Sequence, residues 1–119
     1  MTTMLDAVDL ETQTWVDVCH VQDLLPERGV RALVGAAHVA VFRTHDGEVH
    51  ALDDIDPFSG ASVLSRGIIG TRDDAPVVSS PMFKQAFDLR SGICLDVPSV
   101  SVAVFATRVV NGRVWVARK

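Results

Sequence analysis

The sequence predicts an all-β fold, and three observations support this prediction. Short runs rich in Val, Ile, Phe and Trp recur along the 119 residues, and residues typical of turns separate them. No segment repeats apolar residues at the i, i+3, i+4, i+7 spacing of an amphipathic helix over three turns. Glycine adopts positive φ at little steric cost, so three dipeptides predict tight reversals of the chain. These dipeptides are Asp46-Gly47, Ser91-Gly92 and Asn111-Gly112.

Each expected strand is a run of β-branched, aromatic or other apolar residues, most of them types that favour an extended backbone. In chain order, the expected strands are residues 15–19, 30–34, 39–43, 49–52, 77–79, 86–89, 100–110 and 114–117. Trp15 and Trp115 lie in the terminal strands, and we expect both rings in the core. Residues 21–25 precede a proline and a glycine and predict one or two helical turns. Between residues 53 and 81 the strand pattern weakens, which predicts a loop-rich insert of the kind that usually carries function.

Length and composition fit one soluble globular domain. Apolar residues make up 48% of the chain and charged residues 22%, close to the globular average. The net charge of −4 and the scattered lysines and arginines argue against a nucleic-acid partner. No stretch approaches the roughly 18 apolar residues that span a bilayer, and the first residues do not resemble a signal peptide, so we expect a cytoplasmic protein. Cys19 and Cys94 belong to no metal motif and are expected to be buried free thiols.

No group of residues in the sequence indicates catalysis or metal binding. The histidines at positions 20, 38, 45 and 50 lack the close pairing of zinc sites, and no serine lies in the frame of a hydrolase triad. The sequence GIIG at residues 67–70 lacks the pattern of a phosphate-binding loop, and we expect a tight turn there. Asp53, Asp54 and Asp56 lack the glycine and glutamate of a calcium-binding loop, and we expect solvated loop carboxylates.

The loop-rich insert and the segment after it resemble the two cluster-binding loops of a Rieske domain. The first segment is ALDDIDPFSGASVLSRGIIG and the second is VVSSPMFKQAFDLRSGICLDVP. Pro57 and Pro81 occupy the positions of the two loop prolines, and FDLRSG matches the FDLxTG of that family. In Rieske domains the two loops contribute cysteines and histidines to a [2Fe-2S] cluster, in the patterns CxH and CxxH.

The resemblance places other residues at all four ligand positions. Asp56 and Phe58 occupy the first pair, and Ser80 and Phe83 occupy the second. A phenyl ring has no lone pair to donate to iron, so we expect neither a cluster nor another metal in this chain. One interpretation is that the two rings pack where the cluster would sit and hold the loops together. Lys84 stands where the family has glycine.

The combination of this frame with the sequences DPF and SPMFKQAFDLRSG is typical of the small subunits of bacterial NAD(P)H-dependent nitrite reductases. The chain resembles that family over all but its first dozen residues. The resemblance implies a Rieske-like antiparallel β-sandwich with a smaller loop-rich lobe, with residues 1–12 as a tail and residues 13–119 as the domain. It also implies a partner, a large subunit that carries FAD, a [4Fe-4S] cluster and sirohaem and reduces nitrite to ammonium. This chain would be a non-catalytic subunit that completes or stabilises the complex and holds no cofactor.

In such a domain the two loops form an exposed tip, which is the expected contact surface for the large subunit. Its expected residues are Phe58, Arg66, Phe83 and Lys84, with Arg90 near the two other basic residues. A free-standing adaptor or regulatory module of another oxidoreductase complex is the alternative function. A true Rieske ferredoxin is a third interpretation, which the missing ligands oppose.

Overall fold

The computed structural model describes residues 15–117, so the expected tail lies outside the described residues. Within them the chain is built from strands joined by loops and two single-turn 3-10 helices. The strands are β1 (Trp15–His20), β2 (Gly29–Val34), β3 (Ala37–Arg43), β4 (Val49–Asp53), β5 (Ile68–Arg72), β6 (Ala75–Ser79), β7 (Ala86–Asp88), β8 (Val104–Phe105), β9 (Thr107–Val110) and β10 (Arg113–Ala117). The 3-10 helices are η1 (Val21–Asp23) and η2 (Leu64–Arg66). None of the helices described is long and apolar enough to cross a membrane.

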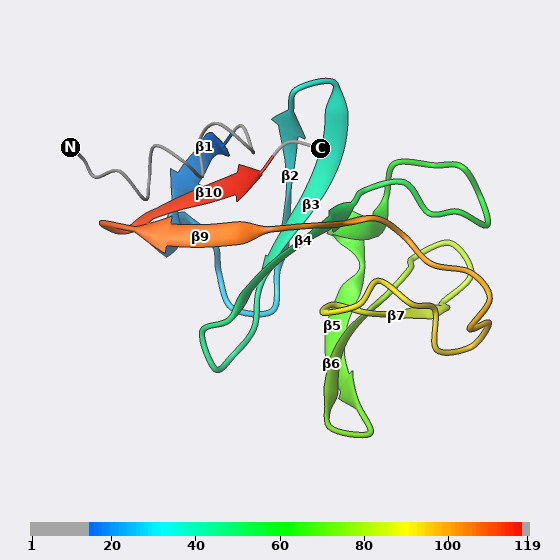
Figure 1. Ribbon diagram of the computed structural model, residues 1–119. Helices are drawn as coiled ribbons and strands as arrows, with labels where there is room; N and C mark the ends of the chain where they lie inside the picture. Colours follow the sequence, from blue (N-terminus) through cyan, green and yellow to red (C-terminus); the bar gives the residue numbers. More distant parts are fainter. Residues whose placement is uncertain (1–14, 118–119) are drawn as a thin grey trace.

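The strands form three antiparallel sheets (Figure 1). One sheet has the order β1-β10-β9, and the central sheet has the order β2-β3-β4-β8. The third sheet, β5-β6-β7, forms a smaller lobe on the opposite side of the central sheet from the first. The predicted all-β antiparallel architecture with a smaller lobe is therefore confirmed.

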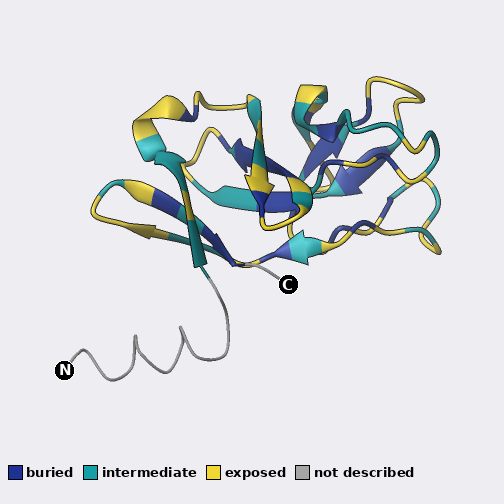
Figure 2. Ribbon diagram, turned by 90° about the horizontal axis from the view of Figure 1, so that it is seen from above, coloured by how far each residue is buried: buried dark blue, intermediate teal, exposed yellow. Residues whose placement is uncertain are grey.

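The middle of β3 is buried on both faces of the central sheet. Its alternate residues point to opposite sides of the sheet and so enter two different cores. Val39 and Val41 belong to a core shared with β10, whereas Ala40 and Phe42 belong to a second core shared with the β5-β6-β7 sheet. All four residues are fully buried. Buried residues accordingly concentrate along the inner strands of the molecule (Figure 2). The smaller lobe is thus packed directly onto the sheet that supports the rest of the fold.

Most expected elements are present, with small shifts at their ends. The expected helical turn after β1 is confirmed as η1. The single strand expected at residues 100–110 is wrong, because the chain changes sheets there. β8 pairs with β4 of the central sheet, and β9 pairs with β10 of the first sheet. The break allows one segment to connect two layers.

The tight turn expected at residues 67–70 is also wrong. Residues 68–72 are strand β5, which pairs along its length with β6. Gly67 has an extended backbone, and any side chain at this position would clash with the Ser79 carbonyl oxygen. The glycine therefore permits a close approach of two strands. The reversal comes at Asp73 and Asp74, where φ is 51° and 66°, a conformation that aspartate tolerates better than most residues.

The three reversals predicted from glycine dipeptides are confirmed. Gly47 and Gly112, with φ of 91° and 78°, lie in the β3–β4 and β9–β10 connections. Gly92 has a φ of 79°, and the chain after it returns along β7 through an antiparallel bridge between Phe87 and Cys94. Glycine is thus placed where the backbone needs positive φ.

The terminal strands β1 and β10 pair with each other, with Trp15 opposite Ala117. Both tryptophans lie in these strands as expected, but they are half-buried and lie outside the core. Val114 and Val116 take the inward positions of β10, so the intervening Trp115 points to the outer face. The guanidinium of Arg108 stacks on the Trp15 ring at 4.6 Å from its centroid. The expected core role of the tryptophans is therefore wrong.

The two cysteines are free thiols, as expected. Cys94 is fully buried in the second core, whereas Cys19 on β1 is half-buried. Burial raises the pKa of the Cys19 thiol, and the nearby Asp23 carboxylate acts in the same direction. A raised pKa keeps the thiol protonated and weakly nucleophilic, which fits a packing role.

Candidate functional site

The two loops that the sequence singles out are closed by the same set of hydrogen bonds. The first loop is residues 56–61, and the second loop is residues 80–85. The Asp56 carboxylate accepts the backbone N–H two residues on (2.8 Å), its C=O accepts the N–H four residues on (2.7 Å), and its N–H donates to the C=O five residues on (2.8 Å). Ser80 makes the same three bonds through its hydroxyl, C=O and N–H, at 3.2, 2.9 and 2.9 Å. Each loop is thus organised by its first residue.

A buried hydrogen bond joins the two loops directly. The Ser80 hydroxyl donates to the Asp56 carboxylate, and the two residues are 1% and 0% exposed. By the resemblance described above, these are the two positions that hold cysteines in a Rieske domain. Where a Rieske domain would bind iron through two thiolates, this chain links its loops through a carboxylate and a hydroxyl.

The expectation that the three loop aspartates are solvated is wrong for two of them. Asp54 and Asp56 are fully buried, whereas Asp53 is partly exposed and accepts the N–H of Ile55. The Asp54 carboxylate accepts the backbone N–H of Ser65 and the hydroxyl of Ser62, both at 2.6 Å. Loop N–H groups that no strand partner satisfies need such acceptors. The buried carboxylates of Asp54 and Asp56 therefore stabilise the loop by accepting hydrogen bonds from its backbone.

A serine, a histidine and an aspartate do meet beside the first loop, but not in a catalytic order. The Ser62 hydroxyl donates to Asp54, and the Nδ1 atom of His38 lies 3.4 Å from the same hydroxyl. In a nucleophilic triad the histidine takes the serine proton and the carboxylate orients the histidine. Here the serine hydroxyl donates its hydrogen bond to the carboxylate and not to the histidine, so the arrangement is structural. No motif in the sequence predicts this contact, because the three residues are widely spaced along the chain.

The two phenylalanines that the resemblance places at the histidine positions have different environments. Phe58 is half-buried and packs against the second core, with its ring centroid 6.2 Å from that of Phe87. Phe83 is 55% exposed, and the adjacent Met82 is 49% exposed. The interpretation that both rings pack together in place of a cluster therefore holds for Phe58 alone. The second loop instead presents two large apolar side chains to solvent.

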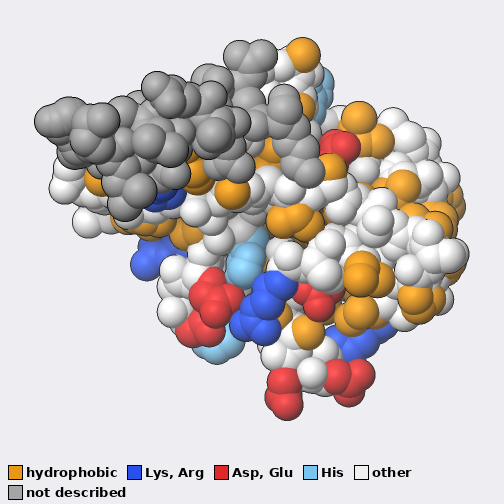
Figure 3. All heavy atoms as spheres, viewed as in Figure 1, with side chains coloured by type: hydrophobic (Ala, Val, Ile, Leu, Met, Phe, Trp, Pro, Cys, Tyr) orange, Lys and Arg blue, Asp and Glu red, His pale blue; other side chains and the backbone are white. Residues whose placement is uncertain are grey.

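The basic residues expected at the tip do not all gather there. Arg66 follows the first loop and Lys84 lies in the second; both are exposed and form no ion pair with any residue that the structure describes. Arg90 lies beyond the other end of β7, where it pairs with Glu48. In Figure 3 hydrophobic side chains are spread over the side that carries the two loops, and charged ones gather lower on the molecule. Among the described residues Lys84 is thus an unpaired cation beside the exposed Met82 and Phe83 of the second loop, whereas Arg66 lies in η2.

The side chains at the ligand positions do not fit a [2Fe-2S] cluster. A Rieske cluster needs two thiolates on one iron and two imidazoles on the other. The loops offer one carboxylate, one hydroxyl and two phenyl rings, and the carboxylate and hydroxyl are already bonded to each other. Among the described residues no group of three or more His, Cys, Asp or Glu side chains is placed to hold a metal ion. No chemical step is therefore derived through a cluster.

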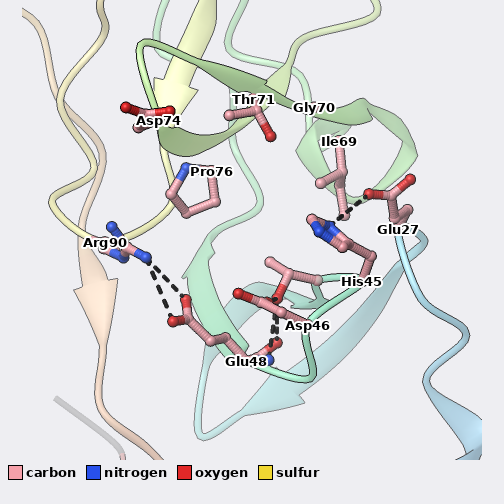
Figure 4. A pocket seen from close by; sticks show the side chains of 11 residues that line it. Glu27, His45, Asp46, Glu48, Ile69, Gly70, Thr71, Asp74, Pro76 and Arg90 are labelled. Carbon is pink, nitrogen blue, oxygen red and sulfur yellow. Dashed lines mark hydrogen bonds and ion pairs between the residues drawn. The ribbon is translucent and has the colours of Figure 1, made fainter.

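A shallow hollow of about 150 Å³ lies between the β3–β4 and β5–β6 turns (Figure 4). Glu48 at its wall accepts a hydrogen bond from His50 (3.0 Å) and pairs with Arg90 (3.4 Å). The His50 hydrogen bond and the Arg90 charge hold the pKa of Glu48 below its ordinary value, and the Thr44 hydroxyl does the same for Asp46. The Nδ1 atom of His45 lies 3.5 Å from the carboxylate of Glu27, which also lines the hollow. These charged side chains around the hollow are therefore already paired with groups of the same chain.

Comparison with known proteins relates this arrangement to one family. Residues 14–117 match the family model of the Rieske-like [2Fe-2S] domain. The chain is 45% identical over 99 residues to the small subunit of nitrite reductase (NADH) of Escherichia coli K12. That alignment covers 82% of this chain and 92% of the Escherichia coli protein. A crystal structure from Mycobacterium tuberculosis, provisionally assigned as an NADH-dependent nitrite reductase small subunit, superposes with a TM-score of 0.87 at 50% identity. That match covers 90% of this chain and 96% of that one.

A further relative is a much longer protein. The chain is 36% identical over 110 residues to the nitrite reductase [NAD(P)H] large subunit of Klebsiella oxytoca. The match covers 92% of this chain but only 11% of the relative. In that organism a segment similar to this chain is therefore part of the large-subunit polypeptide.

Proposed function

This chain belongs to the family of nitrite reductase small subunits, and we propose that it acts as one, bound to the large subunit of an NAD(P)H-dependent nitrite reductase. One observation carries the proposal. The two loops keep the frame of a cluster-binding domain, while a hydrogen bond between Asp56 and Ser80 occupies the place of the thiolate ligands. A domain that keeps this frame without the cluster offers a surface and no redox group. Its contribution to the reaction is contact with a partner.

The chemistry belongs to the partner in this proposal. Reduction of nitrite to ammonium takes six electrons, and the large subunit would supply FAD, a [4Fe-4S] cluster and sirohaem for it. The small subunit has no dinucleotide fingerprint and no cysteine cluster motif in its sequence. We therefore expect the isolated chain to oxidise neither NADH nor NADPH with nitrite. A cytoplasmic location, as expected from the sequence, is part of the same proposal.

The Klebsiella relative supports the choice of partner. A segment similar to this chain is covalently part of a large subunit there, so the two units occur at equal numbers in that protein. Covalent joining raises the effective concentration of one unit beside the other without any new contact. A free small subunit must achieve the same proximity through its surface. This chain should accordingly carry an interface for the large subunit.

The interface in this proposal is the tip formed by the two loops, with Phe58, Arg66, Phe83 and Lys84 as its residues. Phe83 supplies exposed apolar area, and Arg66 and Lys84 supply charge that no described residue neutralises. Phe58 contributes from beneath, because its ring packs on the second core and seats the first loop. Aromatic residues, methionine and arginine are enriched in protein interfaces, and charges around an apolar anchor steer the partners together.

Co-purification with the large subunit of the same organism tests the proposal. We expect a complex that reduces nitrite with NADH or NADPH, and loss of activity when the small subunit is omitted. Arg66→Glu should weaken the complex, whereas Arg113→Glu should not, because Arg113 is exposed on β10, in the sheet on the opposite side of the central sheet from the smaller lobe. If the wild-type chain never associates with the large subunit, the function is wrong and the adaptor alternative takes its place. If only Arg66→Glu is silent, the interface lies elsewhere.

A further inference from the structure

The matching hydrogen bonds of the two loops allow their positions to be compared one by one. The fourth residue after Asp56 is Gly60, and the fourth residue after Ser80 is Lys84. Both residues have left-handed backbones, with φ of 75° and 65°. Glycine adopts this conformation without steric cost, whereas a lysine Cβ crowds the backbone there. The second loop therefore carries a strained residue where its counterpart carries a relaxed one.

The fold itself draws no visible benefit from the Lys84 side chain. The residue is exposed, and its ammonium group forms no hydrogen bond or ion pair with any described residue. Glu27 offers a comparison, because it is a charged residue with the same φ of 65° but its carboxylate lies 3.5 Å from His45 of the same chain. Asp73, Asp74 and Asn111, which also have positive φ, are residue types that tolerate it. Lys84 thus carries a local cost with no partner inside the chain.

Strained residues persist where their side chains serve a function. Lys84 follows Met82 and Phe83 directly, so a cation adjoins two half-exposed apolar side chains on one loop. This combination complements a surface that places a carboxylate beside an apolar recess. We propose that Lys84 is a docking residue, retained in a strained conformation because its ammonium group meets an acidic group of the nitrite reductase large subunit. The inference rests on the proposed function and names the chemistry of the partner's side of the interface.

Three substitutions separate strain from charge. Lys84→Gly removes both, so the affinity of the small subunit for the large subunit should fall by about tenfold. Its Tm should rise by about 2 to 5 °C, because the relief of strain exceeds the extra freedom that glycine gives the unfolded chain. Lys84→Gln keeps the strain and removes the charge, so affinity should fall similarly with the Tm nearly unchanged. Lys84→Arg should keep most of the affinity. Glu27→Gly is the matched control, expected to change the Tm without changing the affinity.

The measurements are the Kd by calorimetry with the purified large subunit at low and high salt, and the Tm of each free variant. Added salt should weaken wild-type binding and leave Lys84→Gln binding less affected, because screening acts on the charge. Failure of the wild-type chain to bind overturns the proposed function itself. Binding that is unchanged in both Lys84→Gly and Lys84→Gln overturns only this inference. A Tm that stays level or falls in Lys84→Gly shows that any strain is too small to outweigh the flexibility of glycine, and it refutes the strain argument. A free small subunit that self-associates through Lys84 assigns the surface to a second copy and also overturns it.

Discussion

Replacing Ser80 with alanine removes the hydroxyl that joins the two loops. The Asp56 carboxylate would keep the N–H of residue 58 as a donor but lose its buried hydroxyl partner, and the Met82 N–H would lose its acceptor. A hydrogen bond to a carboxylate contributes about 1.5 to 3 kcal/mol, and a buried group left without its partner is costly. Because Asp56 and Ser80 are fully buried, water replaces the lost bond poorly. We expect Ser80→Ala to lower the free energy of unfolding by about 2 to 3 kcal/mol.

Urea unfolding followed by tryptophan fluorescence measures this loss, since Trp15 and Trp115 report from the sheet farthest from the loops. The m-value should stay constant, which shows that the same surface is exposed on unfolding. Ser79→Ala is the matched control, because the structure gives the Ser79 hydroxyl no hydrogen bond with the described residues. A double-mutant cycle with Asp56→Ala should return a coupling of about 1 to 2 kcal/mol. A Ser80→Ala midpoint equal to that of the control, or a coupling near zero, would refute the role of this bond.

Three further predictions follow from the same structure. Phe58→Ala should destabilise the domain by about 2 to 4 kcal/mol through a cavity against Phe87, while Phe83→Ala should change stability by less than about 1 kcal/mol; equal urea midpoints would contradict their different burial. The purified protein should be colourless and iron-free after anaerobic purification, and stoichiometric iron with visible absorption bands would contradict the mismatch of ligands. The Ala86 N–H and Arg72 hold the pKa of Asp96 below its usual value, so its stabilising contribution is present above about pH 4 and is lost as the pH falls through the folded-state pKa. Asp96→Asn should therefore show a shallower fall of Tm in acid, and an acid limb parallel to that of wild type would count against the argument.

The strands were predictable where apolar residues dominate a short run of the sequence. β3 illustrates this, because its four buried residues, 39–42, form a continuous apolar run. β5 was missed because two of its five residues are polar, one is glycine, and the turn that follows uses two aspartates in place of glycine. The strand expected at residues 100–110 was too long because nothing in its composition marks the change of sheet. Pattern alone cannot show which sheet a strand joins.

The resemblance predicted which residues to examine in the two loops, but it did not predict how those residues interact. The resemblance located Asp56, Phe58, Ser80 and Phe83, yet it could not show that Asp56 and Ser80 bond to each other across the loops. Aspartate side chains are usually exposed to solvent, so the full burial of Asp54 and Asp56 could not be predicted from residue type. The unequal exposure of the two phenylalanines likewise depends on tertiary packing. The backbone strain at Lys84 has no signature in sequence beyond the absence of glycine.

The pairing of β1 with β10 bears on how such a unit can be carried by other proteins. Trp15 and Ala117 lie opposite each other, so the chain enters and leaves the domain at neighbouring points on one sheet. A unit whose ends adjoin can be appended to a host protein, or inserted into one of its surface loops, without stretching the junctions. The segment of about this length within the Klebsiella oxytoca large subunit is an instance of such modular reuse. Gene fusion and gene separation are therefore both open to this architecture, because neither requires the β1–β10 seam to be rebuilt.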